Sequence, residues 1–157
     1  MQKRLFTVFA CILVLSITSL AAAKKKTAPS GPAPDKASLQ KILDDWSLLD
    51  SSKMAHYYAP GNLNFFDIAP LKYNNWAEYQ TGVGNLLKGY KSLKLTMNDD
   101  AQIHQEGDLV WATATLKEDA VTAAGKRELA TMRWTVIFQF QDGKWLVVHE
   151  HTSEPLT

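Results

Sequence analysis

The sequence predicts an α+β fold in which helices pack on one face of a curved, mainly antiparallel sheet. Amphipathic helical patterns fall in the first half of the chain, whereas nearly everything after Tyr90 has the alternation and turn residues of β-strands. The two runs that end the chain flank Asp142-Gly143, a dipeptide typical of tight hairpins. Helices followed by a meander of long strands are the basis for this fold class.

The N-terminal segment has the pattern of a secretory signal peptide. Lys3 and Arg4 precede an apolar run from Leu5 to Leu20, and Ala21 to Ala23 offer a cleavage site. We expect cleavage after Ala23 and a secreted or periplasmic protein of bacterial type, with no stable membrane insertion afterwards. The alternative is an uncleaved N-terminal helix that anchors the protein, although the run is short for a full membrane span.

Composition predicts one folded domain behind this segment. Residues 24–36 are rich in Lys, Pro, Gly and Ser and are predicted to be a disordered linker, which leaves residues 37–157 for the domain. Cleavage after residue 23 would remove Cys11, the single cysteine, and with it any disulfide or cysteine metal site. It would also leave 15 of the 17 basic residues against all 16 acidic ones. That balance predicts no nucleic-acid partner.

The helical part is expected to contain three helices and a short strand. Apolar residues three and four apart between Leu39 and Leu49 predict the first helix, and residues 54–58 a short second one. A strand over 62–68 and an extended piece over 71–73 follow. A third helix begins near residue 75, and its Gly82 and Gly84 are expected to let a neighbouring element approach closely.

The strands after residue 90 are expected at 93–98, 103–105, 109–117 and 128–140 and after the Asp142-Gly143 turn, with Trp111 in the core. Even positions from Ala130 to Phe140 are apolar, but the odd positions and the last strand are mixed rather than cleanly polar. A sheet with one face in water alternates cleanly. We therefore expect the second face to be covered, most economically by a second subunit.

Two segments carry a family resemblance. Residues 66–82 (FDIAPLKYNNWAEYQTG) and 142–155 (DGKWLVVHEHTSEP) resemble the SnoaL-like, ketosteroid-isomerase-like proteins of the NTF2-like superfamily. The ending is also similar to the association domain of calcium/calmodulin-dependent protein kinase II, which shares the DGKW and VHxHxS pattern. The resemblance covers residues 37–155. It implies an NTF2-like cone with a pocket between the helices and the concave sheet face, and dimerisation through the other face.

Strand alternation separates the HEH triplet near the end of the chain. His149 and His151 must share one face, whereas Glu150 lies on the other. A three-residue loop at the last turn pairs Trp134 with Glu150 and Arg133 with His151, whereas a two-residue loop pairs Trp134 with His151. We favour the three-residue loop because it gives one coherent apolar wall. The predicted pocket then consists of Trp134, Val136, Phe138, Val148, Glu150 and Trp76.

Four residues are candidates for acid–base chemistry. Glu150 lies at the polar end of an apolar wall, where burial would raise its pKa as a general acid or base requires; a salt-bridged or solvated rim carboxylate is the alternative. Asp67 is either a base at the pocket mouth or a cap of the following turn. Tyr57 or Tyr58 would donate a hydrogen bond. The resemblance to ketosteroid isomerases implies a carboxylate base with a tyrosine and a protonated acid as donors, but no such trio matches residue by residue.

The remaining histidines suggest either a metal or anion site or a dimer interface. Two histidines on one strand need further metal ligands, and no spacing brings His56 or His104 close to them. We favour a homodimer interface with Arg133, His149 and His151 on the outer sheet face, and we predict neither a metal nor a cofactor. The expected function is binding of a small apolar or amphipathic organic molecule, and we favour a non-catalytic role. The alternative is a cofactor-independent isomerase, cyclase or dehydratase, because the fold hosts both kinds of protein.

Overall fold

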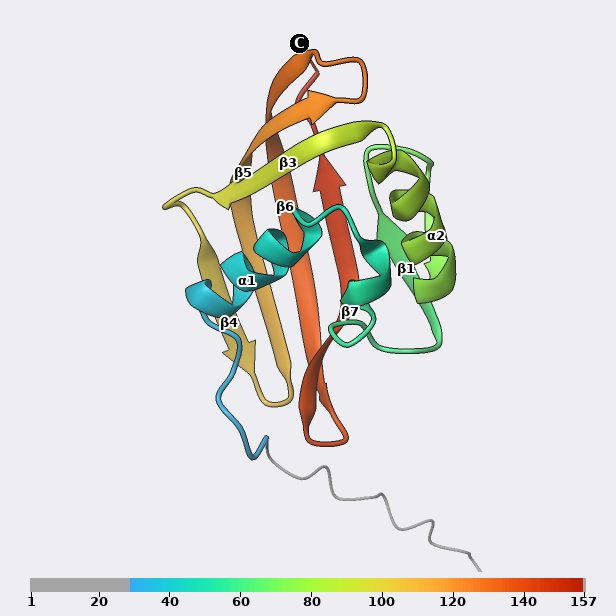
Figure 1. Cartoon of the computed structure of the whole chain (residues 1–157). Coiled ribbons are helices and arrows are strands. Elements are labelled where there is room, and N and C mark those ends of the chain that lie inside the picture. The colour runs from blue at the N-terminus through green and yellow to red at the C-terminus, as the bar shows by residue number, and fades with distance from the viewer. Residues whose placement is uncertain (1–28, 157) are drawn as a thin grey trace, which may run out of the picture.

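The computed structural model describes residues 29–156 and confirms the α+β architecture (Figure 1). The predicted signal peptide lies outside the described residues, as do residues 24–28 of the predicted linker. The helical elements are α1 (Lys36–Trp46), the 3₁₀ helix η1 (Ser51–Met54) and α2 (Trp76–Leu87). The strands are β1 (Asn62–Phe66), β2 (Tyr73–Asn75), β3 (Tyr90–Met97), β4 (Gln102–Glu106), β5 (Leu109–Thr122), β6 (Arg127–Gln141) and β7 (Lys144–Ser153). Within residues 29–156, no helix is both long and apolar enough to cross a membrane.

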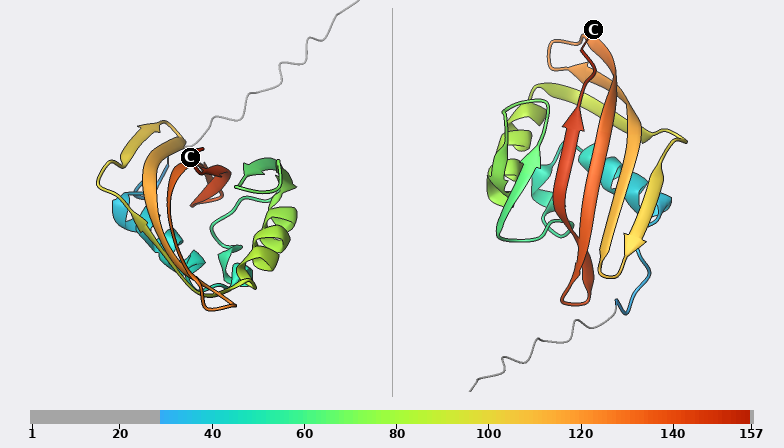
Figure 2. Two further views of the ribbon diagram at one scale, coloured as in Figure 1. Left: turned by 90° about the horizontal axis from the view of Figure 1, so that it is seen from above. Right: turned by 180° about the vertical axis from the view of Figure 1, so that it is seen from behind.

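All seven strands form one curved sheet, in the order β2-β1-β7-β6-β5-β3. The long strand β5 has two partners on the same side, because β4 pairs with its first half and β3 with its second half. Neighbouring strands are antiparallel except β1 and β7, which run parallel. Both α-helices lie on the concave face, and the view from behind shows the convex face without a helix (Figure 2).

Helix α1 forms where its apolar stripe predicts it. Asp35 caps its N-terminus by accepting a hydrogen bond from the Ser38 backbone nitrogen at 2.8 Å. Its inward face then buries four side chains against the sheet: Leu39, Ile42, Leu43 and Trp46.

Helix α1 is also hydrogen-bonded to the edge of strand β3. The Gln40 side chain donates to the Leu95 carbonyl at 3.0 Å and accepts from the Met97 backbone nitrogen at 2.9 Å. Ser47 Oγ accepts from the Leu95 nitrogen at 3.1 Å. These side chains satisfy backbone groups that an adjacent strand would otherwise pair. They hold α1 over the concave face.

The second predicted helix is misplaced. The 3₁₀ helix η1 ends at Met54, residues 55–57 form a turn, and Tyr58 makes an isolated bridge to Val147 of β7. The Val147 nitrogen donates to the Tyr57 carbonyl at 2.7 Å, and the Ala59 nitrogen donates to the Val147 carbonyl at 2.9 Å. Tyr58 is buried, whereas Tyr57, at the end of the preceding turn, is only half-buried.

Strand β6 turns into β7 through a two-residue loop, so the predicted three-residue loop is wrong. Gln141 pairs with Lys144, and the two residues between them have positive φ, 48° at Asp142 and 83° at Gly143. Two positive φ values are the geometry of a type I′ hairpin turn, whose twist matches that of the strands.

A bulge at Val148 then shifts the register again. Phe138 pairs with Val147 but Ile137 pairs with His149, so one extra residue is accommodated in β7. As a result Val136 lies opposite Glu150, and neither register considered from the sequence holds beyond the bulge. Glu150 is nevertheless on the concave face, because Val136 is buried there. The predicted separation of Glu150 from the two histidines is confirmed.

Trp111 is not a core residue, contrary to the expectation from sequence. It is 38% exposed on the convex face, where its ring stacks on His104 of β4 with centroids 5.2 Å apart. Its neighbours Val110 and Ala112 are buried instead. Both faces of this strand carry apolar side chains, so the pattern of the sequence did not show which face is buried.

The close approach expected at the α2 glycines is present. A Cβ at Gly82 would lie 2.3 Å from the ring of Tyr73, and one at Gly84 would lie 2.5 Å from Ser51 Oγ. The absence of a side chain at Gly82 therefore lets α2 pack directly on β2.

Candidate functional site

The concave face encloses a cavity of about 220 Å³ between helices α1 and α2 and one end of the sheet. Most of its wall is aliphatic or aromatic, and its polar lining consists of carboxyl, hydroxyl and indole groups. The lining residues are Leu43, Trp46, Asp67, Ile68, Tyr79, Val83, Leu86, Leu87, Tyr90, Leu93, Leu95, Leu116, Glu118, Met132, Trp134, Glu150, Thr152 and Glu154.

Glu150 is the buried polar group of this cavity, and it is 3% exposed. Its Oε2 accepts a hydrogen bond from the Tyr58 hydroxyl at 2.5 Å and a longer one from the Tyr79 hydroxyl at 3.4 Å. Its Oε1 accepts from Trp134 Nε1 at 2.6 Å. Three donors from three separate elements therefore fix the carboxyl group in one orientation.

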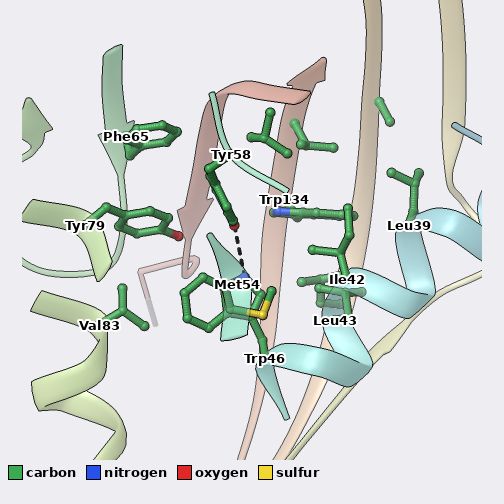
Figure 3. Close-up of a cluster of buried hydrophobic side chains, with 14 of the residues drawn as sticks. Leu39, Ile42, Leu43, Trp46, Met54, Tyr58, Phe65, Tyr79, Val83 and Trp134 are labelled. Atoms are coloured by element: carbon green, nitrogen blue, oxygen red, sulfur yellow. Dashed lines mark hydrogen bonds between the residues drawn. The ribbon is translucent and has the colours of Figure 1, made fainter. Parts of the chain in front are cut away.

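Tyr58 is itself held by two tryptophans. Trp46 Nε1 donates to the Tyr58 hydroxyl at 3.0 Å, and the Trp76 ring stacks on the Tyr58 ring with centroids 4.1 Å apart. The hydrogen bonds run in sequence from Trp46 through Tyr58 to Glu150. In the close-up the polar atoms of Trp46, Tyr58, Tyr79 and Trp134 point toward a common region (Figure 3).

Burial decides the protonation behaviour of this group. Burial and, to a smaller extent, the nearby charge of Asp67 raise the pKa of Glu150 to about 7, against the lowering effect of the hydrogen bonds from Tyr58 and Trp134. Burial also raises the pKa of Tyr58 well above its ordinary value, and the adjacent Glu150 adds to this. Near neutral pH, Glu150 can therefore either hold or accept a proton, whereas Tyr58 remains a donor.

Asp67 also lines the cavity, directly after the end of β1. It is half-buried, and burial raises its pKa although it accepts a hydrogen bond from the backbone nitrogen of Ile68 at 2.8 Å. The geometry is compatible with both roles considered for Asp67. It caps the following turn by accepting a hydrogen bond from Ile68, and it faces the cavity, where a base would lie.

Tyr57, the other tyrosine candidate, lies away from the cavity. Its hydroxyl donates to Asp45 Oδ2 at 2.6 Å, and burial together with this carboxylate raises the pKa of Tyr57 to about 12. Its ring contacts His56, with centroids 3.9 Å apart. The bridge between Tyr58 and Val147 gives Tyr58 the buried position.

The structure separates the residues of the predicted pocket. Trp134 and Glu150 line the cavity, whereas Val136 and Phe138 belong to the closed core farther along β6. Val148 is the bulged residue and does not line the cavity; Val147 is fully buried in its place. Trp76 supports Tyr58 from behind rather than forming a wall. The bulge accounts for Val148, whereas Val136 and Phe138 lie on the predicted face but at the closed end of the sheet.

His149, His151 and Arg133 lie on the convex side of the sheet. Both histidine rings contact the edge of Phe66, and His149 Nδ1 is 2.8 Å from the Asn64 carbonyl oxygen. Arg133 is exposed and contacts the Glu154 carbonyl at 3.5 Å. In residues 29–156, no group of three or more histidine, cysteine, aspartate or glutamate side chains is arranged to hold a metal ion.

Several cavity residues were not recognised from the sequence, above all Glu118 and Glu154. The signal for Glu118 was present, because it continues the inward series of Ala112, Ala114 and Leu116. It was missed because the strand was expected to end at Lys117, whereas β5 extends to Thr122. Glu154 follows β7, and its position depends on the path of the chain after the last strand.

Comparison with known proteins identifies the family. The model of the SnoaL-like domain matches residues 36–157. The chain belongs to the SnoaL-like family. This confirms the resemblance carried by the two segments quoted above. No curated protein matches the chain.

Solved structures of NTF2-like proteins share this architecture. An NTF2-like superfamily protein from Salmonella enterica serovar Typhimurium has a TM-score of 0.68 at 17% identity, covering 77% of this chain and 91% of its own. A candidate calcium/calmodulin-dependent protein kinase II association domain from Xanthomonas campestris has a TM-score of 0.64 at 20% identity, covering 82% and 95%. A candidate dehydratase from Streptomyces avermitilis has a TM-score of 0.66 at 11% identity, covering 77% and 95%. At these identities the likeness establishes an NTF2-like fold and nothing more specific.

Proposed function

We propose that this SnoaL-like domain binds a small, largely apolar organic molecule in the cavity, with Glu150 as the buried group that contacts its polar end. The observation that carries the proposal is an aliphatic cavity in which one buried carboxyl group is held by three hydrogen-bond donors. Apolar pockets with a few fixed polar groups are the usual form of small-molecule sites. The hydrogen bonds give Glu150 a fixed direction, as recognition of a polar ligand group requires.

The test is binding of the neutral fluorophore N-phenyl-1-naphthylamine to wild type and to a variant with a smaller cavity. Leu93→Trp adds volume at a half-buried lining position, and we expect it to weaken binding at least about tenfold, or about 1.4 kcal/mol. Leu129→Trp, at a side chain that is 70% exposed and outside the lining, is the control and should bind as wild type does. Equal affinities for all three proteins would show that the cavity is not the binding site.

Acid–base catalysis is a second candidate function. Glu150 has a pKa raised to about 7 and a tyrosine donor at 2.5 Å, which is the combination expected of a general base with an adjacent donor. Known structures with this fold include a candidate dehydratase, which fits this possibility at the level of the fold.

A proton-exchange assay distinguishes catalysis from binding alone. If Glu150 is a base, the protein will accelerate deuterium exchange at the carbon next to the carbonyl of 2-tetralone in D₂O. The rate should rise with pH through about 7 as Glu150 loses its proton, and Glu150→Gln should abolish the acceleration. Glu106→Gln, at an exposed carboxylate outside the cavity, should leave it unchanged. Equal exchange in wild type and Glu150→Gln would leave binding as the function.

Export and dimerisation complete the proposal. The basic and apolar pattern of residues 1–23 supports cleavage after Ala23. N-terminal sequencing of the protein from the periplasm or medium would test this cleavage. An intact N-terminus in the membrane fraction would support the anchored alternative. The convex face carries Trp111, Arg133, His149 and His151, and this supports a homodimer. Sedimentation that shows a monomer at micromolar concentration would contradict it.

A further inference from the structure

The cavity lining has an unbalanced charge. It contains four carboxyl groups, those of Asp67, Glu118, Glu150 and Glu154, and no lysine, arginine or histidine. None of the four is in an ion pair with a lysine, arginine or histidine of residues 29–156, whose ion pairs involve other carboxylates. An apolar cavity with only negative ionisable groups requires a compensating charge whenever those groups are ionised.

The carboxyl groups are arranged by depth. Glu150 is buried, Asp67 and Glu118 are half-buried, and Glu154 is exposed. Three of them gather at one end of the sheet: Asp67 follows β1 beside the end of β7, Glu154 follows β7, and Glu118 lies near the far end of β5. The acidic groups therefore extend from the opening of the cavity to its buried carboxyl group.

The acidic groups affect one another. Burial raises the pKa of Glu118, and the charges of Glu154, Glu128 and Asp67 raise it further. Asp67 likewise raises the pKa of Glu150. Like charges that share a poorly solvated site repel one another, and a positive charge placed among them relieves this repulsion.

The geometry favours an organic cation over a metal ion. The carboxyl groups surround the cavity, and within residues 29–156 no three acidic or histidine groups converge on a point that would hold a metal. The intervening wall is aliphatic, and it continues to the surface through Ile68 and Leu86, which are 51% and 45% exposed. A ligand that matches both features has an apolar body and a positively charged nitrogen.

We propose that the ligand of this cavity is a lipophilic amine in its ammonium form, with the aliphatic part against the leucine-rich wall and the nitrogen among the carboxyl groups of Asp67, Glu118, Glu150 and Glu154. This inference rests on the proposed binding function and specifies the charge of the ligand. Glu118 and Glu154, which we call the mouth carboxylates, determine the preference for a positively charged ligand. The apolar cavity wall supplies affinity that does not depend on charge.

Three probes of equal chain length test the preference: n-octylammonium, 1-octanol and n-octanoate, each titrated calorimetrically at about pH 8 and low salt. We expect n-octylammonium to bind at least about tenfold more tightly than 1-octanol, and n-octanoate more weakly than either. Raising the ionic strength to about 0.5 M should reduce the preference for the ammonium and leave 1-octanol nearly unaffected, because salt screens charges. The double variant Glu118→Gln/Glu154→Gln should lose most of the preference while it still binds 1-octanol. Glu106→Gln makes the same chemical change outside the cavity, and this control variant should keep the preference of the wild type.

The outcomes separate this inference from the proposed function. If 1-octanol binds as tightly as n-octylammonium, or if n-octanoate binds best, the charge preference is wrong although the cavity binds ligands. If the double variant keeps the full preference, the assignment to the mouth carboxylates is wrong. If none of the three probes binds, the proposed binding function fails and this inference fails with it.

Discussion

The concave face of the sheet has two parts that differ in packing. At one end Val110, Val136, Phe138 and Val147 are at most 3% exposed and form a closed core. At the other end the same strands carry Leu116, Met132, Trp134 and Glu150, which line a cavity of about 220 Å³. We refer to the first set as the closed end and to the second as the cavity end.

The difference shows how one sheet can serve stability and binding separately. Side chains at the closed end are surrounded by protein, so their truncation removes packing contacts on every side. Side chains at the cavity end face the cavity on one side. Their polar groups are held by hydrogen bonds to one another rather than by close packing. Stability is therefore expected to depend more on the closed end and ligand binding more on the cavity end.

The largest expected effect tests this division with two leucines on one helix. Leu39 and Leu43 of α1 are 0% and 1% exposed, but only Leu43 lines the cavity. We expect Leu39→Ala to lower the free energy of unfolding by about 3–5 kcal/mol and Leu43→Ala by about 2–3 kcal/mol, measured by urea unfolding. Leu43→Ala should also change the affinity for N-phenyl-1-naphthylamine. Equal losses of stability with no change in binding would remove the distinction between the two ends.

The next effect concerns the dependence of stability on pH. The pKa of Glu150 is raised from 4.5 to about 7, so between these values the folded protein binds more protons than the unfolded chain. Stability contributed by this group is therefore greatest below about pH 4.5 and falls by about 3 kcal/mol as pH rises to about 7. Glu150→Gln should flatten this part of the profile measured by chemical denaturation at several pH values. Glu106→Gln should retain the full slope.

A smaller effect separates the two tyrosines that donate to Glu150. Tyr58→Phe removes a hydrogen bond of 2.5 Å and leaves Trp46 Nε1 without its acceptor, so we expect a loss of about 1–3 kcal/mol. Tyr79→Phe removes a contact of 3.4 Å and should cost less than about 1 kcal/mol. Thermal and urea unfolding of both variants provide the comparison. A larger cost for Tyr79→Phe would mean that the hydrogen bond from Tyr58 is not the main support of the carboxyl group.

The smallest difference is expected within helix α2. Gly82→Ala introduces a Cβ that would lie 2.3 Å from the Tyr73 ring, and we expect a net loss of about 1–2 kcal/mol despite the better helix propensity of alanine. At Gly84 the nearest atom is Ser51 Oγ, which can rotate away, so Gly84→Ala should change stability by less than about 1 kcal/mol. Urea unfolding of the two variants is the measurement. If Gly82→Ala is stabilising, α2 is not held against β2 by close approach.

Particular residues show how far the sequence was sufficient for the candidate site. Glu150 could be placed on the face opposite His149 and His151 because side-chain alternation is a local property of any strand. Its partners could not be assigned, because Tyr58 is brought to it by a bridge to Val147 and Trp134 by a register that includes a bulge. The choice between Tyr57 and Tyr58 depended on a turn and a bridge to Val147 where a helix was expected.

The sequence by itself determined the α+β class, the first and last helices, the long strands and the position of the final turn, since these follow from periodicity and turn chemistry along the chain. Only the tertiary structure decided that the sheet leaves a cavity at one end and that Asp67, Glu118, Glu150 and Glu154 border it. Those residues come from β5, from β7 and from the segments that follow β1 and β7. Their proximity depends on the curvature of the sheet and on strand register, which are set by contacts between distant segments and are not encoded in any local pattern.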